Sequence, residues 1–224
     1  MPVVHGIGIH VDVEQILRCE GHTGHEMIVD TAGWAARRVC ELAEPAATYR
    51  FIKVKGVSGR KLVVEERQLT IGPLARLLKP AEEILVGICT LGSGVEMEVR
   101  KLQDSGQFLE SYLLNSAAFV GLDCAALELR SLAEAEASRR GWGLSAALSP
   151  GAVAGWDLSD QSTLCSLVDL AAAGVELSPS QLLKPRFSLS VLIGLGKGYG
   201  GHRVSGTCAY CSLGKSCQYR TVDH

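Results

Sequence analysis

The chain has 224 residues, of which 47% are hydrophobic, 21% charged and 5% aromatic. This composition suffices to bury the core of one large domain or two small ones, and it excludes global disorder. Residues 1–180 carry 16 Lys and Arg against 23 Asp and Glu, whereas residues 181–222 carry six positive and no negative side chains. That basic segment is too small to indicate nucleic-acid binding, and no nucleic-acid motif accompanies it.

Hydrophobic periodicity, capping residues and the positions of glycine and proline predict the secondary structure. Helices are expected at 12–18, 27–42, 72–78, 94–102, 108–139 and 159–173. Strands are expected at 49–57, 62–66, 84–89, 142–148, 175–177 and 188–195, the first two joined by a turn at Ser58-Gly59. The order lacks the regular β-α-β alternation of a doubly wound sheet. The sequence therefore predicts one α+β domain over residues 1–200, followed by a cysteine-rich tail over 201–224.

The N-terminal residues lack the pattern of a secretory signal, and no stretch of about 18 apolar residues is apparent. We therefore expect a cytoplasmic protein without a membrane span. In such a protein, the eight cysteines are expected to be thiols or metal ligands rather than disulfides. Five of them stand in apolar patterns and are each expected to be a small core residue: Cys19, Cys40, Cys89, Cys124 and Cys165.

The other three cysteines are close together near the C-terminus, as Cys208, Cys211 and Cys217. A C-x2-C-x5-C spacing lets three thiolates converge on one metal ion or cluster, and the basic side chains around it favour thiolates. The sequence therefore predicts an iron–sulfur cluster or zinc. A complete site needs a fourth ligand, which Cys165, Cys124, His202 or a partner could supply. The alternative is three reduced cysteines on a loose tail.

Two further patterns are weaker. Cys19, His22 and His25 form a C-x2-H-x2-H pattern, but they lie in a glycine-containing link between helices where polar residues are expected anyway. The run of glycines from 194 to 201 could cradle a phosphate with its backbone amides, but it lacks the Gly-Lys-Ser/Thr ending of a P-loop. A flexible hinge that delivers the cysteine tail is at least as good an interpretation. No pair of a nucleophile and a base can be assembled from the sequence.

Five segments carry a family resemblance when taken in order: 89–102, 108–129, 148–161, 174–196 and the terminal CAYCSLGKSCQYR. Together they resemble the reactivation domain of cobalamin-dependent methionine synthase, and more closely its stand-alone relatives, over residues 85–220. The resemblance implies a twisted, mainly antiparallel sheet with flanking helices. It also implies a domain that binds S-adenosylmethionine, caps a corrinoid-bearing domain and helps to restore methylcobalamin from the inactive Co(II) state.

The resemblance implies cofactor contacts at the turn Pro150-Gly151 and on the strand with Lys184, Ser188 and Ser190. The family pattern at the turn is Arg-x-x-Pro-Gly-Tyr, in which the arginine grips the carboxylate of S-adenosylmethionine. Here Ala147 and Ala152 replace the arginine and the tyrosine. Loss of a charge-assisted contact costs about 2–3 kcal/mol, or roughly a hundredfold in affinity. The sequence therefore predicts weak or absent binding of S-adenosylmethionine.

The function expected from the sequence is that of an accessory protein of cobalamin-dependent methyl transfer, which docks or reductively reactivates a corrinoid-binding protein or domain. An iron–sulfur centre would let it pass the electron that Co(II) needs. Two alternatives stay open. One is an S-adenosylmethionine-dependent reactivating enzyme that holds the carboxylate with other residues. The other is a non-catalytic binding module whose zinc staples the tail.

Overall fold

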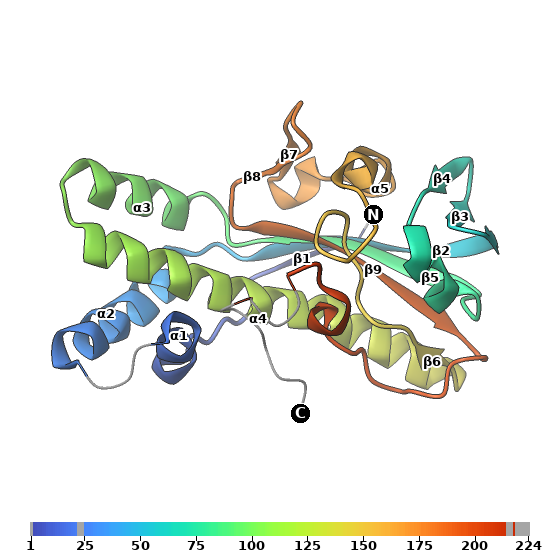
Figure 1. The fold of residues 1–224 in the computed structure, drawn as a ribbon, viewed down its shortest axis with the longest axis horizontal. Helices are drawn as coiled ribbons and strands as arrows, with labels where there is room; N and C mark the ends of the chain where they lie inside the picture. The colour runs from blue at the N-terminus through green and yellow to red at the C-terminus, as the bar shows by residue number, and fades with distance from the viewer. Residues whose placement is uncertain (1, 22–24, 214–216, 218–224) are drawn as a thin grey trace.

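The computed structural model describes residues 2–21, 25–213 and 217. Its α-helices are α1 (Val13–Glu20), α2 (Glu26–Leu42), α3 (Gly94–Asp104), α4 (Phe108–Arg140) and α5 (Gln161–Cys165), and its 3-10 helices are η1 (Gly72–Leu78), η2 (Leu158–Asp160), η3 (Ala171–Ala173) and η4 (Thr207–Tyr210). The strands are β1 (Val3–His5), β2 (Ala46–Ser58), β3 (Lys61–Val64), β4 (Arg67–Leu69), β5 (Glu83–Thr90), β6 (Gly143–Leu144), β7 (Glu176–Leu177), β8 (Leu183–Lys184) and β9 (Ser188–Gly196). Figure 1 shows their arrangement, which confirms the predicted α+β class.

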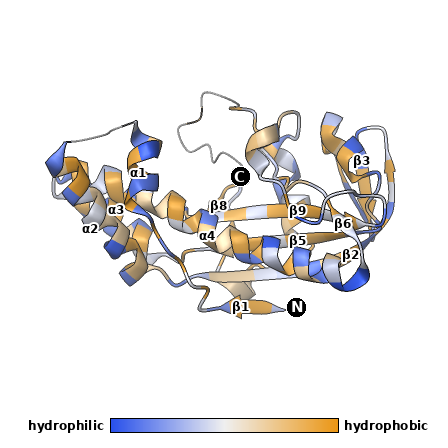
Figure 2. Ribbon diagram, turned by 90° about the horizontal axis from the view of Figure 1, so that it is seen from below, coloured by the Kyte–Doolittle hydropathy of each residue, from blue (hydrophilic) through white to orange (hydrophobic). Residues whose placement is uncertain are grey.

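The main sheet has the strand order β4-β3-β2-β5-β9-β6, with β1 paired to β2, and every pairing in it is antiparallel. The central strand β5 is buried on both faces, which explains its uninterrupted apolar run. Leu85 and Cys89 point into one core cluster, whereas Ile84, Val86 and Ile88 point into the other. The buried residues of β5 and β9 are divided between the two clusters, and Figure 2 shows hydrophobic residues along both strands.

One face of the sheet is covered by α4, which packs on β5 and β9 and is flanked by α1, α2 and α3. The close approach of α4 depends on a glycine of β5. A Cβ atom at Gly87 would lie 2.8 Å from a methyl carbon of Leu129. The other face is covered by η1, α5 and the loops around them. The fold is therefore a sheet between two layers of helices and loops, as in Figure 1.

Helix α4 is long and apolar enough to span a membrane by length and composition alone, and it is the one such helix in the described part of the chain. However, 61% of its most apolar window is buried within the fold. Its buried residues include Leu114, Ala118 and Leu129, which belong to the core cluster on this face of the sheet. The apolar character of α4 is thus explained by its position in the core.

The helix predicted over 159–173 is wrong, because this segment is broken into η2, α5 and η3. The side chain of Asp157 accepts a hydrogen bond from the Ser159 N–H (2.8 Å), and that of Asp169 accepts one from the Ala172 N–H (3.2 Å). Such local side-chain bonds start new turns and compete with a continuous helix. The strand predicted at 142–148 is also shorter. It consists of Gly143–Leu144 and a single bridge between Leu148 and Leu192.

The hinge predicted at 194–201 is wrong in its first part, because Gly194 and Gly196 belong to β9. These glycines are needed for close packing. A Cβ atom at Gly196 would lie 2.2 Å from the Pro80 carbonyl oxygen, and one at Gly194 would lie 2.5 Å from the Tyr199 hydroxyl oxygen. Glycine in a strand often marks such an approach of another backbone or side chain.

Glu136 on α4 provides a test of stability against pH. Arg139 binds its carboxylate through two nitrogens (2.7 and 2.9 Å), and this hydrogen bonding, assisted by Arg140, lowers the pKa of Glu136 to about 2. A carboxylate with a lowered pKa stabilises the folded state above its unfolded pKa of 4.5, and that contribution is lost as the pH falls toward 2. Because the site is partly solvated, we expect Glu136→Gln to cost about 1 kcal/mol at pH 7.

Urea unfolding between pH 7 and pH 3 would measure this effect. The difference between the wild type and Glu136→Gln should shrink as the pH falls below about 4.5. Glu66→Gln is a matched control, because the side chain of Glu66 is 94% exposed and pairs only with Lys55 in the described structure. A difference for Glu136→Gln that is independent of pH would show that the ion pair is not its origin.

Candidate functional site

The cysteine-bearing segment lies beside the loop that follows β6. Residues 205–212 run along residues 147–154, and a β-bridge joins Cys211 to Val153. The backbone bonds between them join the Ala147 N–H to the Ser205 oxygen (3.1 Å), the Ala154 N–H to the Tyr210 oxygen (2.9 Å) and the Ser212 N–H to the Ala152 oxygen (2.8 Å). The described part of the tail is therefore fixed on the body, next to the turn that contains Pro150 and Gly151.

The turn itself is held by contacts within the layer of helices and loops that covers the face of the sheet opposite α4. The Gly151 N–H donates to the Trp156 carbonyl oxygen (2.9 Å), and the indole N–H of Trp156 donates to Asp160 (2.9 Å). Gly155 packs against the 3-10 helix η1, where a Cβ atom at Gly72 would lie 2.1 Å from the Gly155 carbonyl oxygen. Since Trp156 is only 2% exposed, the loop is anchored in the core on this face of the sheet.

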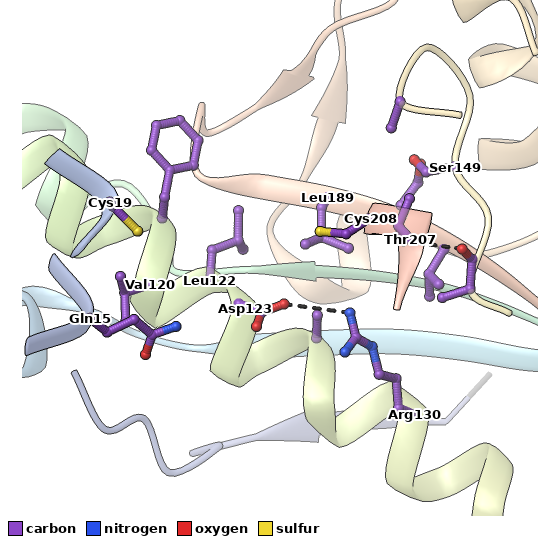
Figure 3. A pocket seen from close by; sticks show the side chains of 16 residues that line it. Gln15, Cys19, Val120, Leu122, Asp123, Arg130, Ser149, Leu189, Thr207 and Cys208 are labelled. Carbon is purple, nitrogen blue, oxygen red and sulfur yellow. Dashed lines mark hydrogen bonds and ion pairs between the residues drawn. The ribbon is translucent and has the colours of Figure 1, made fainter. Parts of the chain in front are cut away.

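A cavity of about 290 Å³, here called the apolar cavity, lies between α1, α4, β9 and η4. Figure 3 shows its wall, in which Leu122 and Leu189 supply apolar surface. Its main charged feature is an ion pair on α4, where an Arg130 nitrogen lies 3.5 Å from an Asp123 oxygen. The Arg130 side chain is only 19% exposed, so this pair is partly shielded from water.

Ala147 and Ala152 both line the apolar cavity. These are the positions at which the family resemblance expects an arginine and a tyrosine. The small side chains leave space where larger ones would stand, and Ala147 itself is only 1% exposed. The guanidinium present in the cavity is instead that of Arg130, which comes from α4 rather than from the turn.

A second and larger hollow of about 980 Å³, here called the basic groove, lies on the other side of the turn. It brings together four of the five residues for which the sequence predicts cofactor contacts: Pro150, Lys184, Ser188 and Ser190. The fifth, Gly151, does not line it. Arg100, Arg186 and Glu96 complete the charged part of its wall.

Ser149 and Ser190 lie between the two hollows and line both of them. Their hydroxyl oxygens are 3.1 Å apart, and the Ser190 hydroxyl also donates to the side-chain oxygen of Gln161 (3.1 Å). Within this hydrogen-bonded row of side chains, Ser190 is buried, with only 3% of its surface exposed. The apolar cavity and the basic groove therefore share one polar wall.

The cysteines are distributed differently from the sequence-based expectation. Cys89 and Cys165 are buried, as predicted for core residues, and burial raises the pKa of each thiol to about 12. However, Cys40 is exposed, and Cys19 and Cys124 are only half-buried. Cys19 lines the apolar cavity together with Cys208. The prediction that all five are core residues is thus wrong for three of them.

Of the three predicted metal ligands, Cys208 and Cys211 lie close together in the structure. Cys208 is on η4 and Cys211 directly follows it, with the Cys211 N–H 3.4 Å from the Cys208 carbonyl oxygen. Over residues 2–21, 25–213 and 217, no group of three or more His, Cys, Asp or Glu side chains is close enough to hold a metal ion. His22, Lys215 and Arg220, which belong to the sequence patterns above, lie outside the described residues.

Sequence reasoning missed the ion pair of Asp123 and Arg130. The sequence does contain a signal for this ion pair, because Asp123 and Arg130 are oppositely charged residues seven positions apart and therefore share one face of the helix. Gln161 was also missed, since its contact with Ser190 depends on how α5 packs over the sheet.

No protein-family model matches the chain, and no curated protein matches it significantly in sequence. Among solved structures, the chain is similar to the crystal structure of the MetH reactivation domain bound to AdoHcy, with a TM-score of 0.61 and 12% sequence identity. The similarity covers 91% of this chain and 81% of that chain. It confirms both the resemblance inferred from the five sequence segments and the fold that the resemblance implies.

Proposed function

We propose that this chain is an accessory protein of cobalamin-dependent methyl transfer, which docks a corrinoid-binding protein or domain and assists its reductive reactivation. The main support is the fold, which is similar to the MetH reactivation domain over 91% of the chain. The order of five sequence segments along the same family pattern supports it independently of the fold. The proposal includes the cytoplasmic location that we expect from the sequence.

The basic groove is the proposed docking region. Lys184 and Arg186 are exposed at its rim, and Arg100 adds a third cation. Glu96 is the one carboxylate among the described residues that line it, and that carboxylate already binds the Arg186 backbone N–H (2.8 Å) and the Arg100 side chain. The groove therefore presents net positive charge to an anionic group, such as the phosphate of a corrinoid or an acidic protein face.

The residues of the turn fit S-adenosylmethionine poorly. The structure similar to this chain holds AdoHcy, which is the demethylated form of that compound. Here the position of the carboxylate-gripping arginine is occupied by Ala147, and the adjoining apolar cavity, at about 290 Å³, is at the lower limit of ligand pockets. Arg130 favours the alternative of a true S-adenosylmethionine-dependent enzyme, because its guanidinium could hold the carboxylate from another element.

Titration calorimetry separates these possibilities. We expect S-adenosylmethionine and AdoHcy to bind weakly or not at all, because one charge-assisted contact is lost at Ala147. A low-micromolar dissociation constant that rises at least about tenfold in Arg130→Gln would contradict this and establish the alternative. Lys55→Gln, at an exposed position outside both hollows, controls for the loss of one positive charge.

The second part of the proposal is an inorganic centre at Cys208, Cys211 and Cys217. The support is the cysteine spacing, together with the position of Cys208 at the apolar cavity. An iron–sulfur cluster would supply the electron that Co(II) needs, whereas zinc would serve as a staple between the tail and the body.

Elemental analysis of protein purified without oxygen tests this centre. We expect about one centre of iron or zinc per chain, and Cys211→Ser should lose most of it because one thiolate ligand is removed. A brown chromophore would identify an iron–sulfur cluster. Cys40→Ser, which changes an exposed cysteine on α2, should leave the metal content unchanged. Metal-free protein that folds fully, with no effect of Cys211→Ser, would exclude the centre and leave only the docking role.

A further inference from the structure

Strand β9 has an open edge where its N-terminal half meets the turn at Pro150. The backbone groups of successive residues in a strand point alternately to one side and the other. Leu192 donates its N–H to the Leu148 carbonyl oxygen (2.8 Å) and accepts the Leu148 N–H (2.9 Å), so its groups point to the side of β6. Because the register of β9 on β5 has no bulge, the N–H and C=O groups of Ser188 and Ser190 point to that same side.

These N–H and C=O groups have no hydrogen-bond partner among the described residues. The next bonded pair along the edge would join Pro150 to Ser190, but a proline has no N–H to donate. The Gly151 N–H bonds instead to the Trp156 carbonyl oxygen (2.9 Å), so the chain leaves β9 at this turn. Since Ser190 is only 3% exposed, its unpaired backbone groups cost free energy that a further strand would recover.

The apolar cavity and the basic groove lie on opposite faces of the sheet beside the open edge. Side chains of a strand alternate between the two faces. Leu189 and Val191 point toward α4 and line the apolar cavity, where Figure 3 shows Leu189. Ser188 and Ser190 point to the other face, which is that of the basic groove. The open edge therefore has an apolar hollow on one face and a cationic hollow on the other.

We infer that the open edge binds an extended segment of a partner protein, which adds an antiparallel strand to β9 at Ser188 and Ser190. The inference rests on the docking role proposed above for the basic groove and names what the groove recognises. Alternate side chains of the added strand face opposite sides of the sheet. One set enters the apolar cavity, and the other faces Arg100, Lys184 and Arg186 across the basic groove. The recognised segment therefore alternates apolar and acidic residues.

A peptide segment satisfies more of this surface than a small anion does. A phosphate would neutralise the cations of the basic groove, but it would leave the backbone groups of the open edge and the apolar cavity without a partner. Pairing begins at Ser188, which is half-buried. It extends to Ser190 when the turn at residues 149–151 moves aside, because the Ser149 hydroxyl lies 3.1 Å from that of Ser190.

Fluorescence anisotropy with the full chain tests the inference. The probe is a labelled peptide of about six residues, a common strand length, in which valine and glutamate alternate. It should bind at least about tenfold more tightly than a peptide of the same composition whose valines and glutamates form two blocks, because only alternation places the two kinds on opposite faces. Both peptides have the same charge, so attraction to the cations alone does not distinguish them.

Methylation of the peptide backbone tests the strand itself. Residues directly opposite one another in antiparallel strands share one face of the sheet, so the glutamates lie opposite Ser188 and Ser190 and exchange backbone bonds with them. N-methylation of the glutamates should therefore weaken binding at least about tenfold. N-methylation of the valines, whose N–H groups point away from β9, should have little effect.

Two variants of Ser188 test the open edge from the side of the protein. Ser188→Pro removes the N–H at the open edge and leaves the bonds to β5, which the neighbouring residues make. Ser188→Ala keeps that N–H but loses the hydroxyl, which contacts Thr90 and the Pro185 carbonyl oxygen. Ser188→Pro should weaken the alternating peptide about fivefold more than Ser188→Ala does. Circular dichroism verifies that both variants fold.

The outcomes separate this inference from the function on which it rests. Equal binding of the alternating and block peptides, equal effects of the two methylated sets, or equal losses in the two Ser188 variants would each overturn strand addition. Inorganic phosphate that binds as tightly as the alternating peptide would identify a small-anion site instead. A corrinoid protein that binds without being displaced by the peptide would overturn strand addition and leave docking standing. Peptide binding as expected, without binding to any corrinoid protein, would support the open edge and overturn the docking role.

Discussion

Gly72→Ala should destabilise the protein by about 3 kcal/mol or more, which is the largest effect that we expect from a single methyl group in this fold. Gly72 has a φ of +77°, where an alanine costs about 1–2 kcal/mol. In addition, the new Cβ atom would lie 2.1 Å from the carbonyl oxygen of Gly155. That oxygen belongs to the backbone, so the contact is relieved only by moving η1 away from the loop, and overpacking of this kind costs about 1–3 kcal/mol more.

Gly141→Ala provides the matched control. Gly141 also has a positive φ, of +66°, but nothing lies within 4 Å of a Cβ atom built there. Gly141→Ala should therefore lose only about 1–2 kcal/mol, the cost of the backbone conformation alone. Urea unfolding monitored by circular dichroism would measure both values. Equal losses for the two variants would show that the contact between Gly72 and Gly155 does not fix the loop.

The double charge reversal Lys184→Glu with Arg186→Glu should slow association with a corrinoid-binding partner on the order of tenfold at low salt. Both residues are exposed at the rim of the basic groove. Charges at such positions act mainly on the rate of encounter, and they are screened beyond about 8 Å at physiological ionic strength. The dissociation rate should change less, and binding by the wild type should weaken as salt is added.

Surface plasmon resonance with corrinoid proteins from the same organism would measure both rates. The double reversal Lys55→Glu with Lys61→Glu changes the total charge by the same amount at two exposed positions outside the groove. It separates a local effect from an effect of net charge. Binding that does not depend on salt, or equal effects of both double variants, would contradict docking at the groove. No binding to any corrinoid protein or to free cobalamin would favour the non-catalytic zinc module.

Elements with a strong local pattern could be predicted from the sequence. Helix α4 and strand β5 have long apolar segments bounded by glycines or polar residues, and their predicted limits agree with the structure to within one or two residues. The helix predicted over 159–173 is not continuous, because the side chains of Asp157 and Asp169 accept local hydrogen bonds that interrupt the helical pattern. Gly194 and Gly196 were misinterpreted because their function is close packing against residues 80–82 and 199, which no local pattern shows.

The candidate site could be predicted only where its residues lie close together in the sequence. The turn at Pro150 and the strand with Ser188 and Ser190 are local features, and the structure places them around one groove. In contrast, the apolar cavity is built from α1, α4, β9 and η4, so its residues are far apart in the sequence. Cys19 was predicted to be a core cysteine because no local pattern shows that it lines a cavity together with Cys208, which stands at the other end of the chain.

Residues 205–212 are hydrogen-bonded to residues 147–154, so the cysteine segment and the cavity wall should move together. A molecule that enters the apolar cavity contacts Ala147 and Ala152, whose backbone groups bind Ser205 and Ser212 directly. Free-energy coupling between two such sites is reciprocal. If metal binding at the cysteines disfavours a ligand in the cavity by a given factor, that ligand must disfavour the metal by the same factor. Occupancy of the cavity would then set how tightly the proposed centre binds a metal, and a partner that enters the cavity would load or unload that centre without contacting a sulfur atom.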